Sequence, residues 1–74
     1  DLKELNEARW EQIVLDEMKH LKKEESEIDT SPKGADWKVA IAKRLRKETT
    51  TKNPWIAHRL KMGHANYVSN LVNQ

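Results

Sequence analysis

The chain has 74 residues and no cysteine, so it is long enough for one small domain and has neither disulfides nor thiolate zinc sites. No apolar run reaches the roughly 18 residues of a membrane span, and no signal peptide is visible. We therefore expect a cytoplasmic protein with no membrane partner. Because the chain begins with Asp rather than Met, we also expect it to be part of a longer protein.

Charge is spread unevenly along the chain, although the formal net charge is only +2. Residues 1–31 hold ten acids and five bases, whereas residues 32–74 hold nine bases and two acids. Such an asymmetry is typical of a chain in which one half binds a polyanion. The plainer alternative is that charged helices simply keep the surface solvated. We treat residues 1–31 as an acidic part and residues 32–74 as a basic part of one compact domain.

Hydrophobic periodicity predicts helices along most of the chain, and no alternating strand pattern appears. The first helix should run from Leu2 to about Lys22. Its apolar residues follow the spacing i, i+3, i+4, i+8, i+11 of one buried stripe, and they are Trp10, Ile13, Val14, Met18 and Leu21. Leu5 and Leu15 are expected to widen this stripe. Residues 22–36 are charged and rich in turn formers, so we expect a linker with at most one helical turn over residues 24–28.

Three further helices are predicted in the basic part. One should run from Asp36, as its N-cap, to about Thr49. The next should run over residues 54–61, with Asn53 as N-cap and Pro54 at the first helical position, where its missing N–H is harmless. After a tight turn at Gly63, the last helix should cover residues 65–72. The sequence thus predicts an all-α bundle of four to five helices.

Residues 54–72 match a helix-turn-helix pattern. Ala57 is small enough for two helices to cross closely, Leu60 and Met62 enter the core from the first helix, and Val68 and Leu71 return from the second. In such motifs the second helix lies in the DNA major groove and contacts bases through its N-terminal residues.

The last helix carries an unusual number of polar side chains. Asparagine is a poor helix former, because its amide competes for backbone hydrogen bonds. An Asn can, however, form a bidentate pair with adenine N6 and N7. We therefore predict that the face opposite the apolar side reads bases, through His64, Ala65, Asn66, Ser69 and Asn70. The alternative is a solvated helix close to a chain end, where asparagine costs little.

Affinity for DNA comes mostly from phosphate contacts. The candidates for these contacts are Lys43, Arg44, Lys47, Lys52, Asn53, Arg59 and Lys61. Asn53 is included because backbone N–H groups at a helix start bind phosphate. Duplex, hairpin and single-stranded targets all remain open.

The stretch from Trp37 to Val72 resembles the C-terminal tail of bacterial REP-associated tyrosine transposases, which are relatives of the HUH single-strand transposases. The matching pieces are Arg44-Leu45-Arg46-Lys47-Glu48-Thr49-Thr50, Trp55-Ile56-Ala57, Arg59-Leu60, Met62-Gly63 and Tyr67-Val68-Ser69-Asn70-Leu71. The resemblance implies an accessory DNA-binding module of a protein that acts in transposition, with a catalytic domain upstream and a nucleoid-associated location. The family's catalytic part needs a His-hydrophobic-His motif that this chain lacks, so no transposase activity is carried over.

Other chemistry finds little support in the sequence. The three histidines show no metal-ligand spacing, Ser69 has no local base, and no Gly-rich phosphate loop is present, so we expect no enzyme activity, no metal and no cofactor. Tyr67 is expected to be buried rather than nucleophilic. The three tryptophans are expected to pack in the core, as one cluster, rather than to stack on unpaired bases. The rival function is a protein-interaction or dimerisation module that uses the acidic amphipathic helix.

Overall fold

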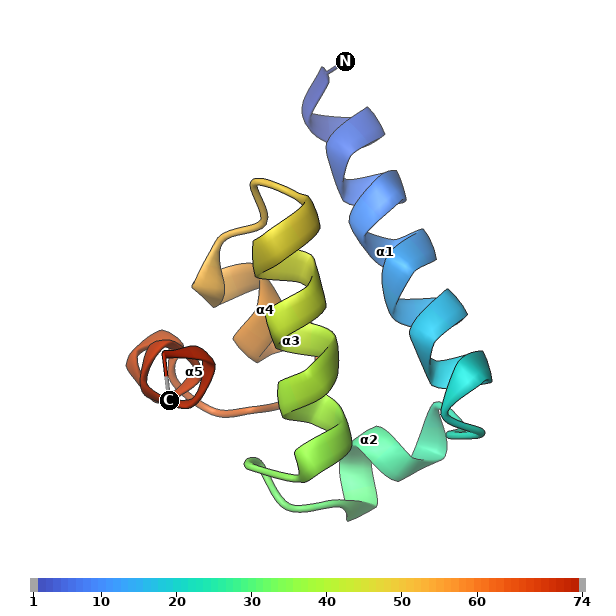
Figure 1. Ribbon diagram of the computed structural model, residues 1–74, viewed down its shortest axis with the longest axis vertical. Helices are drawn as coiled ribbons and strands as arrows, with labels where there is room; N and C mark the ends of the chain where they lie inside the picture. Colours follow the sequence, from blue (N-terminus) through green and yellow to red (C-terminus); the bar gives the residue numbers. More distant parts are fainter. Residues whose placement is uncertain (1, 74) are drawn as a thin grey trace.

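Five helices make up the computed structural model, which describes residues 2–73 (Figure 1). They are α1 (Leu2–His20), α2 (Ser26–Thr30), α3 (Asp36–Glu48), α4 (Asn53–Arg59) and α5 (Ala65–Val72). No strand occurs among the described residues, so the predicted all-α fold is confirmed. In Figure 1, α1 and α3 run side by side in opposite directions and α2 joins them at one end. No helix in residues 2–73 is long and apolar enough to cross a membrane.

All five helices contribute to one core. The buried apolar residues are Ile13, Val14, Met18, Ile28, Ile41, Ala42, Leu45, Ile56, Ala57, Leu60, Met62 and Val68. The predicted stripe of α1 is therefore largely correct, but its two extensions are wrong. Leu5 is 67% exposed and Leu15 is 45% exposed. The buried stripe is narrow because α1 packs mainly against α3 and has no second helix on its other flank.

The helix ends differ from the predicted caps. The N-cap of α3 is Ala35 and that of α4 is Lys52, so Asp36 and Asn53 are the first helical residues instead. Neither α3 nor α4 has a side-chain cap bond at its N-cap. At the C-terminal end of α4, Lys61 adopts a positive φ of 51° and the Met62 N–H donates to the Ala57 carbonyl at 2.9 Å. This is the Schellman arrangement, which satisfies carbonyls that the helix leaves without partners.

The predicted linker is ordered around a buried lysine. The Lys38 side chain is fully buried, and its Nζ donates to the carbonyls of Ile28 at 2.8 Å and Ser31 at 3.3 Å. Both carbonyls lie at the C-terminal end of α2, where they have no helical partners. Desolvation lowers the pKa of Lys38, and the nearby carboxylate of Asp29 opposes this shift. Lys38 thus fixes α2 and the following loop onto α3.

Candidate nucleic-acid interface

α4 and α5 form a packed pair joined by a short turn. α5 contacts both α4 and α3, and Leu60, Met62 and Val68 are fully buried between them. Gly63 has a φ of +88°, a conformation that side chains rarely adopt, so a glycine suits this turn. In Figure 1, α5 is seen nearly end-on while α3 runs along the picture, so α5 crosses α3 steeply.

The loop before α3 lies against this pair. A Cβ at Gly34 would be 2.6 Å from the Tyr67 hydroxyl, and a Cβ at Gly63 would be 3.2 Å from Lys33 Cδ. The Lys33 side chain therefore passes over the turn that leads into α5. Lys33 could not be predicted from the sequence to lie here, because the loop that carries it lies far from the turn in the sequence.

The exposed face of α5 contains the predicted asparagines but also includes Tyr67, and its small residues are less accessible than expected. Ala65 and Ser69 are half-buried, with Val68 between them. Together with Val72 they follow the spacing i, i+3, i+4, i+7 of a single packed stripe. The residues of α5 and its C-cap that are exposed are Asn66, Tyr67, Asn70 and Asn73. Ala65 and Ser69 are thus less accessible than the asparagines, although Ser69 Oγ accepts a hydrogen bond from Asn73 Nδ2 at 3.4 Å. The prediction that Tyr67 is buried is wrong, since this residue is 41% exposed.

His64 and the two central asparagines lie at the start of α5. His64 is the N-cap, and its Nδ1 accepts a hydrogen bond from the Asn66 N–H at 3.1 Å. In the neutral ring this bond places the proton on Nε2, so His64 offers an outward donor. The structure records no hydrogen bond from the side chains of Asn66 and Asn70 to any described residue, and the two lie one turn apart on the exposed face.

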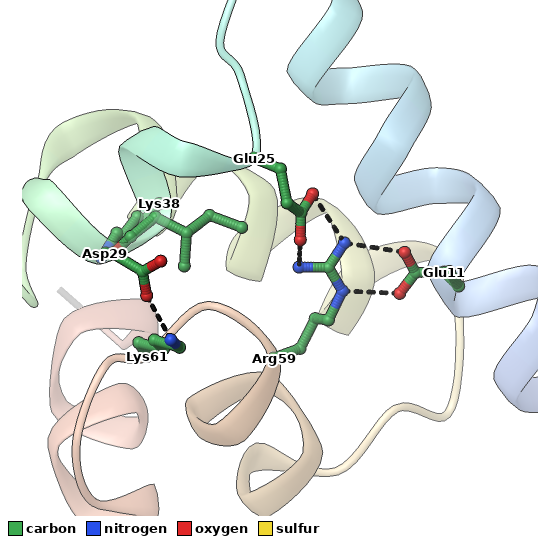
Figure 2. A network of polar contacts seen from close by, with 7 residues as sticks. Glu11, Glu25, Asp29, Lys38, Arg59 and Lys61 are labelled. Carbon is green, nitrogen blue, oxygen red and sulfur yellow. Dashed lines mark hydrogen bonds and ion pairs between the residues drawn. The ribbon is translucent and has the colours of Figure 1, made fainter.

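Arg59, a predicted phosphate ligand, is bound by two acids of the chain. Figure 2 shows its guanidinium between the carboxylates of Glu11 from α1 and Glu25, which precedes α2. The Nε and Nη2 groups donate to Glu11 at 2.6 and 2.7 Å, and Nη1 lies 2.6 Å from Glu25. The hydrogen bond with Glu11 is the main reason that the pKa of Arg59 is raised. With a side chain only 17% exposed, Arg59 ties α4 to the acidic part.

Arg44 and Lys61 are engaged in a similar way. Arg44 pairs with Glu17, with Asp16 at 3.4 Å and with Glu48 at 3.0 Å, and the bond with Glu17 is the main reason that its pKa is raised. Arg44, Asp16 and Glu17 line a hollow of about 500 Å³ between α1 and α3. Lys61 pairs with Asp29 of α2 (Figure 2). Three of the predicted phosphate ligands therefore already have carboxylate partners.

The other phosphate candidates are dispersed. Lys43, Lys47 and Lys52 are exposed, and no ion pair within residues 5–73 involves them. Lys47 lies at the end of α3 beside Arg9 of α1. Asn53 is half-buried, and its Oδ1 is buried, so it is the least exposed of this group.

The predicted tryptophan cluster is only partly present. The Trp10 and Trp55 ring centroids are 5.4 Å apart, whereas Trp37 lies near Lys23 and Lys38.

The fold and the surface of α5 define a small all-α domain with an exposed amide-bearing helix. Within the described part of the chain, no group of three or more His, Asp or Glu side chains is arranged to hold a metal ion. No family model, no curated protein and no solved structure matches the chain.

Proposed function

We propose that α4 and α5 form a helix-turn-helix that binds DNA, with α5 in the major groove. One observation carries the proposal: α5 is anchored in the core on one side and presents the unpartnered amides of Asn66 and Asn70 on the other. Both lie in the first two turns, which is where recognition helices contact base edges. A helix that served only as a solvated end would gain nothing from two asparagines in its middle.

The proposed contacts follow from the chemistry of these side chains. Asn66 and Asn70 would each form a bidentate pair with an adenine, worth about 1–3 kcal/mol against a wrong base. His64 Nε2 would donate to a base acceptor or a phosphate. Arg44, Arg59 and Lys61 are held by carboxylates, and Lys47 lines a hollow with Arg9 of α1. The phosphate contacts beside α5 therefore fall to Lys33, Lys43 and Lys52.

The resemblance of residues 37–72 to a transposase tail supports the same proposal. In this reading the chain is an accessory module of a larger bacterial protein that acts in transposition, and a separate domain performs the chemistry. A module this small binds weakly alone, since specific protein–DNA complexes bury more surface than one short helix provides. The remaining affinity would come from the rest of the parent protein.

Selection from a pool of random duplexes, followed by fluorescence anisotropy on the enriched sequence, tests this proposal. We expect Asn66→Ala and Asn70→Ala each to weaken the selected duplex by about 1–3 kcal/mol and to relax the preference at one position. Gln12→Ala, which removes an exposed amide from α1, is the matched control and should change nothing. No enrichment at low salt, or equal losses in all three variants, would refute the proposal.

Salt dependence separates DNA binding from the rival protein-interaction function. With three phosphate contacts, the logarithm of the association constant should fall with the logarithm of salt at a slope of about −2.7. The rival protein-interaction function would need the apolar stripe of α1 to contact a partner, but Ile13, Val14 and Met18 are already buried in the core. Among the side chains of α1 that the structure describes, from residue 5 onward, the exposed large apolar ones are Leu5 and Leu15, and contact through them would be nearly independent of salt.

A further inference from the structure

A second polar hollow lies away from α5, where the first half of α1 meets the end of α3. Its volume is about 370 Å³, within the range of small-ligand sites. Asn6, Arg9 and Trp10 line it from α1, where the spacing i, i+3, i+4 places them on one face. Lys47 and Thr50 line it from the end of α3 and the turn that follows.

The charged groups around this hollow favour an anion. Arg9 and Lys47 are both exposed, come from different helices, and take part in no ion pair within residues 5–73. The one carboxylate in the lining, that of Glu48, already accepts a hydrogen bond from Arg44 Nε at 3.0 Å. The C-terminal end of α3 would repel an anion, but the carbonyl of Leu45 there accepts bonds from the N–H and hydroxyl of Thr49.

The hollow also has an aromatic residue in its lining. Trp10 is one of the lining residues, and its ring packs edge-to-face against Trp55 with an interplanar angle of 70°, which restricts its orientation. A fixed indole is a platform on which any nucleobase can stack, because every base has a flat π-face. Asn6 and Thr50 add an amide and a hydroxyl to the lining.

We propose that this hollow binds an unpaired nucleotide of a nucleic-acid strand, with its phosphate on Arg9 and Lys47 and its base against Trp10. The combination of an indole side chain and two cations from separate helices matches a nucleotide better than an acidic peptide, which offers charge without a ring. The inference rests on the proposed function in one respect, since it takes the ligand to be nucleic acid. It does not depend on α5, because no residue of α5 lines the hollow.

The test is an NMR titration of the chain with single-stranded oligothymidylate, with the indole N–H signals of the three tryptophans as the readout. We expect the Trp10 signal to shift most, the Trp55 signal to follow weakly, and the Trp37 signal to stay in place. The double variant Arg9→Gln/Lys47→Gln should weaken binding by about tenfold. The matched control Lys19→Gln/Lys22→Gln, which removes the same charge from exposed sites, should change it by less than about twofold.

Three results would overturn this inference: a Trp10 signal that does not move at saturating oligonucleotide, equal losses in both double variants, or an equal Trp10 shift with polyglutamate. The last result would show a general anion site. The duplex experiment with Asn66→Ala and Asn70→Ala is read separately. Oligothymidylate binding that depends on Arg9 and Lys47, with no duplex selected, would refute the α5 proposal and leave this one standing. Duplex selection with an unmoved Trp10 signal would do the reverse.

Discussion

Gly34 lies in the loop before α3, and the Tyr67 hydroxyl occupies the space where a side chain at this position would go. A Cβ there would be 2.6 Å from the hydroxyl oxygen, about 1 Å inside ordinary contact. The φ of Gly34 lies outside the left-handed region, so Gly34→Ala introduces overcrowding without that backbone strain. The result of this substitution therefore reports on whether the loop packs against α5.

The size of the stability change for Gly34→Ala follows from the same contacts. Overpacking costs typically 1–3 kcal/mol, and the lower end applies because the Tyr67 ring is 41% exposed and can swing outward. Replacing glycine by alanine also stabilises by about 0.4–1 kcal/mol through the unfolded chain. We expect a net loss of about 1 kcal/mol for Gly34→Ala, or about 4–8 °C in Tm for a domain of this size.

Tyr67→Phe removes the clashing oxygen. The atom next nearest to the added Cβ is then Tyr67 Cζ, at 3.6 Å, which is ordinary contact. In that background Gly34→Ala should be neutral or stabilising by about 0.5 kcal/mol, which gives a coupling energy of about 1–1.5 kcal/mol. Urea unfolding of the wild type, both single variants and the double variant measures this coupling. A coupling near zero would show that the loop does not pack against α5 as described.

Three further predictions concern helix ends and buried cations. Lys22 has a φ of 59°, which costs less for glycine than for lysine, so Lys22→Gly should stabilise the protein by about 0.5–1 kcal/mol in thermal unfolding. The control Lys19→Gly, within α1, should destabilise it by about 1 kcal/mol. Arg59→Lys should lower the free energy of unfolding by about 1 kcal/mol in urea at low salt, because an ammonium cannot form the paired bonds to both carboxylates. An equal loss at high salt would contradict this ionic origin. Because the pKa of Lys38 is below its ordinary value of 10.5, the unfolded state binds more protons between these two values. The wild type should therefore gain stability relative to Lys38→Met as the pH rises toward 10.5, and a constant or falling difference in urea unfolding across this range would refute the assignment.

The sequence predicted the helices well because their apolar periodicity is local. The stripe of Ile13, Val14 and Met18 is visible within two turns, and so is the break at Gly63. Lys38 could not be predicted to be buried, because its burial depends on carbonyls seven and ten residues earlier that only the folded loop brings near.

The partial burial of Ala65 and Ser69 in α5 could not be predicted from the sequence either. A helical wheel at about 100° per residue places Ser69 beside the asparagines, but it does not show how closely the neighbouring helices approach. In the structure, the packed side of α5 is set by where α3 and α4 approach it, and a small residue such as Ser69 fits there as well as an apolar one. Small size, rather than hydrophobicity, is the signal that could have separated Ala65 and Ser69 from Asn66 and Asn70.

The two oppositely charged parts of the chain bind each other, so the charge asymmetry that indicated a polyanion partner is partly neutralised within the protein. Arg59, Arg44 and Lys61 of the basic part pair with carboxylates of the acidic part, across as many as 48 residues of sequence. Each such pair removes a cation from those available to phosphate, so under the proposed function non-specific binding of DNA is weak. Discrimination then depends on α5 to a larger degree than in a strongly basic domain. Weak non-specific binding raises the ratio of specific to non-specific affinity, and this ratio decides how well one DNA site is found among many competing sites. Under the same proposal, this property would suit an accessory module whose affinity is supplemented by the rest of a larger protein.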